Sequence, residues 1–417
     1  MTASRLIVFH EAREVGTLQA HEEGAMRFSY ATSWLSSPDA FPISVRMPLR
    51  SGEYEREAAA FFPNLLPEGN VRLRLARRLG LSVENDFELL AAVGGECAGA
   101  LTLMPEGQSP VEQGTSYREI SPRDLLKLAD GGGALPVLGG SEGLRLSLAG
   151  AQDKVPVRMD GDRIFLPEGN APSTHILKFE SPYFKHLPAN EVFTLMLAQA
   201  VRVPAVQGTL LAVGRRRIFL VERYDRREGN GLIHRLHQED LCQALAVPPA
   251  RKYEREGGPA FADCFQVVAD ASLEPARDAR ALLRWLVFNV LALNADGHAK
   301  NLSLLYGEGG CVLAPAYDLI CTRAYPSLAR SLAMSIAGEW DPTLLLRRHW
   351  ERLAERLGVG RRYVIELVSE MADGMPEALS ATSKAFRERH GDSPALQLTV
   401  PKIRAQARRL RRRLEEA

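Results

Sequence analysis

The segment "NADGHAKNLSLL", residues 294–305, carries an aspartate, a histidine, a lysine and an asparagine close together. It directly follows the apolar segment 281–293, which has the length and composition of a buried helix. A turn that merely ended such a helix would need only Asn294 and Gly297. A buried helix is also a rigid platform of the kind that catalytic groups require. Residues 296–301 are therefore either an ordinary turn or a catalytic loop.

A second aspartate, in "APAYDLI", follows in the order found in protein kinases. Asp296 and Asn301 form the pattern D-x-x-x-x-N, and Asp318 comes after a predicted hairpin. Phosphoryl transfer requires a carboxylate that accepts the hydroxyl proton, and oxygen ligands that hold Mg²⁺ on the phosphates. In that interpretation Asp296 is the base, and Asn301 and Asp318 bind the metal. The spacing is equally compatible with an Asp-Gly turn, an Asx-turn and a loop aspartate.

Upstream features would suit a nucleotide. The small residues of "LSLAGAQDKVPV" (146–157) let backbone N–H groups approach a polyanion, although an ordinary hairpin would look the same. Lys178 lies in the strand-like "HILKFE", where it faces either solvent or a cleft. Glu191 begins the next helix, either as an ion-pair partner of Lys178 or as an acid favoured by the helix dipole. The segment "FLVERYDRR" (219–227) would offer backbone groups to an adenine, or it is simply a strand end.

Composition places the chain among globular proteins. It has 417 residues, 46% hydrophobic and 25% charged, so two or three domains are expected. The net charge of +1 gives no overall electrostatic reason to bind nucleic acid or membrane. The five cysteines are scattered without C-x-x-C spacing, which favours a reducing cytoplasm over disulfides or a zinc site. The apolar segment 281–293 contains Arg284 and is shorter than the roughly 20 residues of a membrane span. We therefore expect a cytoplasmic protein without a membrane partner.

The chain divides into four expected regions and an α+β fold. A β-rich block followed by a helical block predicts two lobes with a cleft between them. The predicted regions are an α+β subdomain (1–105), a linker with a short helix (106–143), a β-rich lobe (144–225) and a helical lobe (226–417). Within them, helices are predicted over 55–81 and 85–95, from Ser121 as a capping-box start, and over 189–201. Predicted strands include 5–10, 25–31, 42–48, 97–105, 302–306, 311–314 and 332–337, whereas 106–120 is predicted to lack structure.

Several of these segments together resemble one family, the HipA-type serine/threonine kinases, which are the toxins of bacterial HipA–HipB toxin–antitoxin modules. The resemblance covers nearly the whole chain and rests on ordered motifs: "FFPNLLPEG", "GGECAGALTLMP", "SLAGAQDK", "THILKFE", "VERYDR", "QEDLCQAL", "KYEREGGP", "NADGHAKNLSLL" and "APAYDLI". The chain has "AYD" where D-F-G is usual in protein kinases and lacks H-R-D, and both departures are shared with the family.

The resemblance implies a bilobal kinase-like fold with an extra N-terminal subdomain, ATP and Mg²⁺ as cofactors, and a specific set of site residues. Asp296 would be the catalytic base, and Asn301 and Asp318 would bind Mg²⁺. Ser147 would be autophosphorylated, which displaces its loop and inactivates the kinase. The ATP-binding residues implied are Ser147, Leu148, Ala149, Gly150, Ala151, Gln152 and Lys154 in the small-residue loop, Lys178, the hinge residues Glu222, Arg223 and Tyr224, and His298.

The resemblance also implies partners. The expected substrate is an aminoacyl-tRNA synthetase such as glutamyl-tRNA synthetase, whose modification causes growth arrest and persistence. A small helix-turn-helix antitoxin, HipB, would bind the kinase and tether it to operator DNA. One alternative is a non-catalytic corepressor acting through HipB, to which the basic helix expected over 400–417 could contribute if it is more than a solvated face. Another is a metal hydrolase that uses Asp296, His298 and Asp318 as ligands, although no further histidine follows with ligand spacing.

Overall fold

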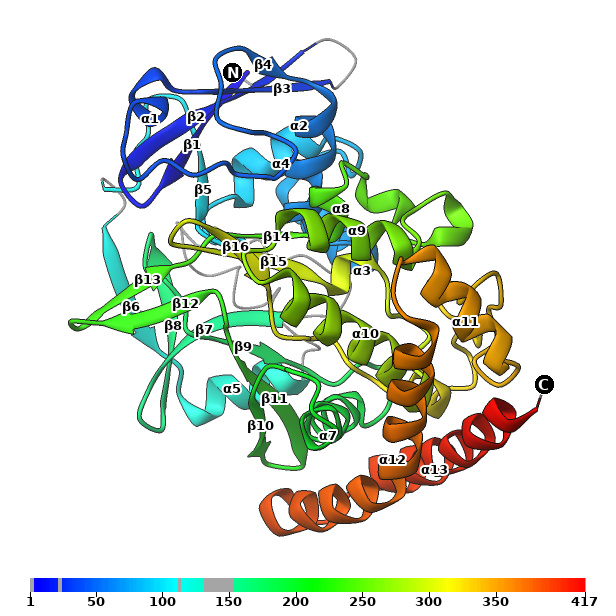
Figure 1. Cartoon of the computed structure of the whole chain (residues 1–417). Coiled ribbons are helices and arrows are strands. Elements are labelled where there is room, and N and C mark those ends of the chain that lie inside the picture. The colour runs from blue at the N-terminus through cyan, green and yellow to red at the C-terminus, as the bar shows by residue number, and fades with distance from the viewer. Residues whose placement is uncertain (1–3, 22–24, 112–113, 131–153, 417) are drawn as a thin grey trace. The chain divides into compact units, whose positions relative to one another are not determined.

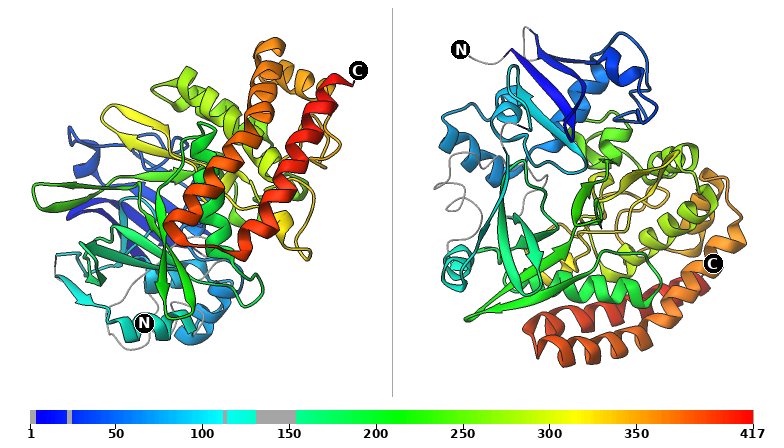
Figure 2. Two further views of the ribbon diagram at one scale, coloured as in Figure 1. Left: turned by 90° about the horizontal axis from the view of Figure 1, so that it is seen from below. Right: turned by 90° about the vertical axis from the view of Figure 1, so that its left-hand side faces the viewer.

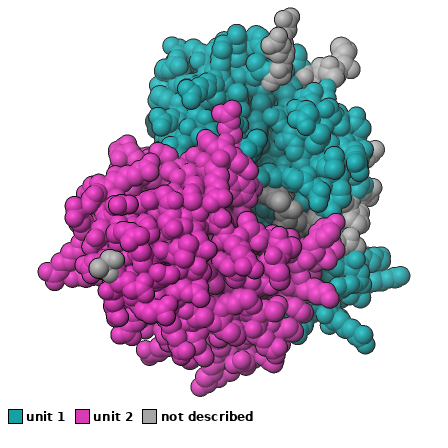
Figure 3. Space-filling model, turned by 90° about the vertical axis from the view of Figure 1, so that its right-hand side faces the viewer, with its two compact units in different colours: residues 1–179, 212–250, 303–311 teal, residues 180–211, 251–302, 312–417 magenta. Residues whose placement is uncertain are grey.

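The computed structural model describes residues 4–21, 25–111, 114–130 and 154–416. The chain forms two compact units (Figure 3), which are described one at a time. Unit 1 contains residues 1–179, 212–250 and 303–311, and unit 2 contains residues 180–211, 251–302 and 312–417. Among the helices of the described ranges, none is both long and apolar enough to cross a membrane.

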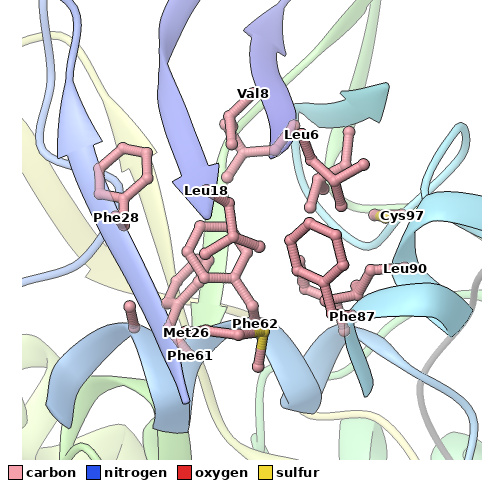
Figure 4. Close-up of a cluster of buried hydrophobic side chains, with 14 of the residues drawn as sticks. Leu6, Val8, Leu18, Met26, Phe28, Phe61, Phe62, Phe87, Leu90 and Cys97 are labelled. Atoms are coloured by element: carbon pink, nitrogen blue, oxygen red, sulfur yellow. The ribbon is translucent and has the colours of Figure 1, made fainter. Parts of the chain in front are cut away.

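The first hundred residues of unit 1 form an antiparallel sheet covered by helices. The sheet has the strand order β4-β3-β2-β1-β5, and its strands are β1 (Arg5–His10), β2 (Arg13–Ala20), β3 (Met26–Tyr30), β4 (Glu53–Tyr54) and β5 (Leu101–Pro105). The helices are α1 (Thr32–Leu35), α2 (Arg56–Phe61), α3 (Gly69–Leu79) and α4 (Asp86–Val93), with a 3-10 turn η2 (Phe62–Leu65). Alternate strand residues such as Leu6, Val8 and Leu18 point to one face and pack with Phe61 and Phe62 in a single apolar core (Figure 4).

The rest of unit 1 is mostly β-structure. A sheet of order β10-β11-β9-β7-β8-β6 is followed in the chain by a hairpin and by a small sheet of order β14-β15-β16 (Figure 1). The strands are β6 (Thr115–Glu119), β7 (Lys154–Asp160), β8 (Arg163–Gly169), β9 (His175–Lys178), β10 (Gly208–Val213), β11 (Arg216–Glu222), β12 (Arg226–Gly229), β13 (Leu232–Arg235), β14 (Gln238–Asp240), β15 (Ser303–Gly307) and β16 (Gly310–Leu313). Residues 208–211 of β10 and 312–313 of β16 are assigned to unit 2. The helical elements are α5 (Pro122–Asp130), α8 (Leu241–Ala244) and η3 (Pro249–Arg251).

Unit 2 is helical. Its elements are α7 (Leu187–Ala200), η4 (Glu254–Glu256), α9 (Phe261–Ala271), α10 (Pro275–Ala292), η5 (Ala299–Asn301), η6 (Thr322–Ala324), α11 (Arg347–Arg356), α12 (Arg361–His390) and α13 (Pro394–Glu415). The last two helices lie side by side in all three ribbon views (Figures 1 and 2). Eleven residues of α10, among them Trp285 and Phe288, are buried, so this helix is the apolar platform that the sequence predicted.

The mixed α+β fold agrees with the prediction, and most predicted elements are present. Several predictions were wrong, among them the single helix over 55–81, which is divided into α2, η2 and α3. Residues 42–48 form only a bridge between Ser44 and Met47, because prolines flank the segment. Residues 332–337 likewise contribute only one end of an isolated bridge, Ile336 to Glu339. The supposedly structureless segment 106–120 contains β6, an edge strand held to β8 by charge pairs such as Arg118–Glu168.

Candidate active site

The segment after α10 is held in one conformation by its own polar side chains. Helix α10 ends because Leu293 adopts a left-handed conformation, with φ of +56°. The Asn294 amide then donates to Asn289 Oδ1 at 2.7 Å, and its own Oδ1 accepts the backbone N–H of Asp296 at 3.2 Å. Gly297 lies against Asn289, where a Cβ atom would meet the amide carbon at 3.2 Å. Part of the polar character of "NADG" is therefore structural, as the turn interpretation expected.

Asp296 is fixed from several sides, although its side chain is 47% exposed. Its carbonyl oxygen accepts the backbone N–H of His298 at 2.9 Å and the side-chain amide of Asn301 at 2.8 Å. Its carboxylate oxygen Oδ1 accepts the hydroxyl of Tyr253 at 2.7 Å and lies 3.8 Å from His298 Nε2. The carboxylate is thus both reachable and oriented, which are the two properties that a general base needs.

Asn301 has a fixed amide orientation. Its nitrogen is directed at the Asp296 carbonyl, so its oxygen, which is the atom that a hard cation binds, points elsewhere. Asn301 closes the 3-10 turn η5 and is 7% exposed. The structure therefore brings the first and last polar residues of the pattern D-x-x-x-x-N together through a direct hydrogen bond.

Asp318 lies in the irregular segment that follows β16. The Tyr317 hydroxyl donates to the carbonyl of Lys300 at 2.8 Å, which links the residue before Asp318 to the residue before Asn301. Asp318 adopts a left-handed backbone, with φ of +53°, a conformation that aspartate tolerates better than most side chains. The hairpin predicted between Asn301 and Asp318 is present as β15 and β16.

Two lysines face the same side of the large sheet of unit 1. Lys154 on β7 and Lys178 on β9 are direct partners in the antiparallel register, and direct partners point to the same face. Lys178 is only 6% exposed, and its ammonium lies 5.8 Å from the centre of the Phe219 ring. Residues 147–152 of the small-residue loop lie outside the described part of the chain.

The predicted hinge, residues 222–224, is anchored by a buried ion network. The guanidinium of Arg223 contacts Asp225 at 2.7 Å and Glu96 at 3.0 Å, and its backbone N–H donates to the Thr174 carbonyl. Burial alone would lower the pKa of Arg223, but Asp225 and Glu96 raise that pKa above its ordinary value. Glu222 is exposed at the end of β11, and the Tyr224 hydroxyl donates to Gln238. Arg223 therefore supports this segment with its side chain engaged inside unit 1.

Sequence reasoning gave no role to Tyr253 or Glu96, although both lie in motifs that it singled out. The contact between Tyr253 and Asp296 joins residues far apart in the chain, and the contact between Glu96 and Arg223 spans a still longer separation. The sequence signal that could have identified them is that Tyr253 lies in the motif "KYEREGGP" and Glu96 in the motif "GGECAGALTLMP".

The residues present suit Mg²⁺ held mainly by phosphates. Asn301 offers an amide oxygen and Asp318 a carboxylate, which are ligands that Mg²⁺ uses together with nucleotide phosphates and water. Within the described ranges, no group of three or more His, Cys, Asp or Glu side chains could hold a metal ion by itself.

Family models match both the N-terminal and the C-terminal part of the chain. The HipA N-terminal domain model matches residues 6–104, and the HipA-like C-terminal domain model matches residues 146–379. Protein Y4mE of Sinorhizobium fredii is 40% identical over 396 residues, which are 93% of this chain and 94% of that protein. The serine/threonine-protein kinase toxin HipA of Shewanella oneidensis is 31% identical over 364 residues, 84% of this chain and 82% of that protein.

A solved structure agrees over the full length. In the complex of HipA, HipB and operator DNA from Shewanella oneidensis MR-1, one chain superposes with a TM-score of 0.85 at 28% identity. The match covers 98% of this chain and 97% of that chain. The overall fold is therefore the kinase-like fold of HipA, preceded by the same N-terminal subdomain. Both domain models, the curated relatives and the structure agree, and the chain belongs to the HipA-type kinase family.

Proposed function

We propose that this protein is an ATP- and Mg²⁺-dependent serine/threonine protein kinase that acts as the toxin of a toxin–antitoxin module. The observation that carries the proposal is the hydrogen bond from the Asn301 amide to the Asp296 carbonyl, which joins the proposed metal ligand to the proposed base. Family membership supplies the reaction class, and the geometry of unit 2 supplies residues suited to its steps.

In the proposed reaction Asp296 accepts the proton of the acceptor hydroxyl while that oxygen forms its bond to the γ-phosphorus and the bond from the γ-phosphorus to the departing ADP oxygen breaks. Asn301 and Asp318 would hold Mg²⁺, and the ion would supply neutralisation of the charge on the phosphates. Lys154 and Lys178 bind phosphate oxygens. The segment 222–224 receives the adenine, with Arg223 as its internal support.

The proposed biological target is an aminoacyl-tRNA synthetase such as glutamyl-tRNA synthetase, and its modification would produce growth arrest and persistence. Autophosphorylation of Ser147 would inactivate the kinase, and a HipB-like antitoxin would neutralise it at operator DNA. The likeness to a HipA chain solved with HipB and operator DNA supports the antitoxin partner. The substrate class is what the resemblance of the motifs to the family implies.

Incubation with radiolabelled ATP and Mg²⁺ tests the proposal. The wild-type protein should label itself on Ser147, and Asp296→Ala should take up no label because the base is removed. Loss of activity on omission of ATP distinguishes a kinase from a metal hydrolase. If neither the protein nor any synthetase is labelled, and Asp296→Ala arrests growth as the wild type does, the corepressor alternative replaces the kinase.

A further inference from the structure

The motif "KYEREGGP" carries a residue that reaches the catalytic loop. Tyr253 lies just before the 3-10 turn η4, and its hydroxyl donates to Asp296 Oδ1 at 2.7 Å. The edge of one ring meets the face of the other between Tyr253 and His298, with centroids 5.2 Å apart and planes at 80°. The side chain of Tyr253 therefore contacts the catalytic loop twice, through its hydroxyl at Asp296 and through its ring at His298.

A half-exposed aspartate needs such a contact if it is to act as a base. The backbone of Asp296 is fixed by Asn294, His298 and Asn301, but these contacts leave rotation about the side-chain bonds. A hydrogen bond to one carboxylate oxygen selects a rotamer and fixes the plane of the group. Oδ2 is then presented to the acceptor hydroxyl in a constant direction.

Tyr253 is mounted on a rigid turn. Its carbonyl oxygen accepts the backbone N–H groups of Glu256 and Gly258, each at 3.0 Å. A Cβ atom at Gly258 would lie 1.9 Å from the Arg251 carbonyl oxygen, so the turn requires glycine at that position. The turn therefore holds the backbone of Tyr253 in place.

The next residue clamps the same turn to the segment that follows Asp318 in the chain. Glu254 Oε2 accepts the backbone N–H of Ser335 at 2.5 Å, and Oε1 accepts the Ser335 hydroxyl at 3.0 Å. The Glu254 backbone N–H donates to the Ala333 carbonyl at 3.3 Å. A displacement of residues 333–335 would be transmitted through Glu254 to Tyr253 and so to Asp296.

We propose that Tyr253 is a positioning residue for the base Asp296, and that the Glu254–Ser335 clamp holds Tyr253 in its working position. The inference rests on the proposed kinase function. During transfer the acceptor oxygen bonds to the γ-phosphorus, the bond to the departing ADP oxygen breaks, and the acceptor proton passes to Asp296. Tyr253 keeps its own proton and acts only through the direction of the carboxylate.

Kinetics of Tyr253→Phe in the full chain test this inference. The substitution keeps the ring against His298 and removes only the hydroxyl, so the rate constant for autophosphorylation at saturating ATP should fall about 10- to 100-fold. The KM for ATP and the melting temperature should stay unchanged, a split that a general structural defect would not give. Tyr117→Phe is the matched control, since it also removes a partly buried hydroxyl bonded to oxygen, here the Pro172 carbonyl at 2.9 Å, and should keep the wild-type rate.

The clamp provides a second variant that does not alter Tyr253. Glu254→Gln should lower the same rate constant by less than Tyr253→Phe does, and combining the two should add little. If wild-type protein transfers phosphate and Tyr253→Phe transfers it equally fast, the inference is wrong and the kinase proposal stands. If wild-type protein transfers none, the proposed function fails and the inference fails with it. If the Tyr253→Phe protein does not fold, Glu254→Gln becomes the deciding variant. A rate constant for Glu254→Gln equal to that of the wild type would then overturn the inference.

Discussion

At the scale of single residues, Asn301 combines two contacts in one side chain. Its amide nitrogen holds the Asp296 carbonyl, and its oxygen is left for the proposed Mg²⁺. Substitution can separate the two contacts. Asn301→Asp keeps an oxygen ligand but loses the donor, whereas Asn301→Ala loses both.

We expect Asn301→Ala to lower the phosphorylation rate at least about 100-fold, or about 3 kcal/mol of transition-state stabilisation, and to raise the Mg²⁺ concentration needed for half-maximal rate. Asn301→Asp should also be slow but should need no more Mg²⁺ than the wild type. Titration of the rate with Mg²⁺ at fixed ATP measures both effects. As a control, Asn85→Ala removes the N-cap of α4 and should cost about 1 kcal/mol of stability without changing the titration. Equal Mg²⁺ requirements for the two Asn301 variants would exclude Asn301 as a ligand.

The sequence predicted those candidate residues that lie close to one another along the chain. Asp296 and Asn301 are five residues apart, and their spacing is visible without a structure. Tyr253 could not be assigned in this way, because its hydroxyl meets Asp296 across 43 residues of chain. A tyrosine next to charged residues also has no periodic pattern that would point to its partner.

At the scale of elements, the buried ion network connects strands and loops of unit 1. Glu96 precedes β5 in the chain, Arg223 and Arg226 flank the step from β11 to β12, and Arg235 ends β13. Glu96 contacts all three guanidinium groups at distances of 2.6–3.0 Å. Burial by itself would raise the pKa of Glu96, but Arg235, Arg226 and Arg223 together hold it well below its ordinary value.

Glu96→Gln should destabilise the protein by about 3–5 kcal/mol, because Arg223 and Arg226 would keep Asp225 while the buried Arg235 would lose the carboxylate that it contacts in the network. Denaturant unfolding monitored by circular dichroism measures the change. Glu106→Gln is the matched control, since it removes the same charge from an ion pair with Arg5 in which both side chains are at least 42% exposed. Its cost should be below about 1 kcal/mol. Equal costs for the two variants would show that the network is not a major source of stability.

Elements with a hydropathy pattern were predictable, and those held by polar contacts were not. β1 contains a continuous apolar run and β3 alternates apolar with polar residues, and both were found from the sequence. In contrast, β6 has mostly exposed side chains and pairs through Arg118 and Glu119. The helix predicted over 55–81 is interrupted by Pro63 and Pro67, which divide it into α2, η2 and α3.

At the scale of the whole molecule, stability depends on pH through buried groups whose effects oppose one another. Burial raises the pKa of Glu239 from 4.5 to about 7, even though Ser44, Tyr306 and Val45 donate hydrogen bonds to it. Burial lowers the pKa of His237 from 6.5 to about 4, and its Nε2 lies 2.8 Å from the Ile43 carbonyl. His237 directly precedes β14, and Glu239 is the second residue of that strand.

The signs follow from which state binds the proton. Glu239 holds its proton more tightly in the folded state, so its contribution to stability is fully present below pH 4.5 and is lost as the pH rises through about 7. His237 holds its proton less tightly in the folded state, so its contribution is present above pH 6.5 and is lost as the pH falls through about 4. Between about pH 4.5 and 6.5 the unfolding free energy falls with pH because of Glu239 and rises with pH because of His237. These two slopes offset one another, so the unfolding free energy of the wild-type protein shows neither titration.

Comparison with Glu239→Gln should make the titration of Glu239 measurable. Glutamine keeps an acceptor for the Val45 N–H, at 2.9 Å, and the Tyr306 hydroxyl, at 2.6 Å, but it cannot titrate. The difference in unfolding free energy, wild type minus Glu239→Gln, should therefore fall by about 3 kcal/mol between pH 4.5 and 7.5, since the pKa change from 4.5 to about 7 corresponds to that energy. Urea unfolding of both proteins across this range measures it, and taking the difference removes the shared titration of Glu96 and His237. The nearby Asp240 carboxylate, which raises the pKa of Glu239, remains in both proteins. A difference that stayed constant with pH would mean that Glu239 titrates normally in the folded protein, and its burial among three donors would then need another explanation.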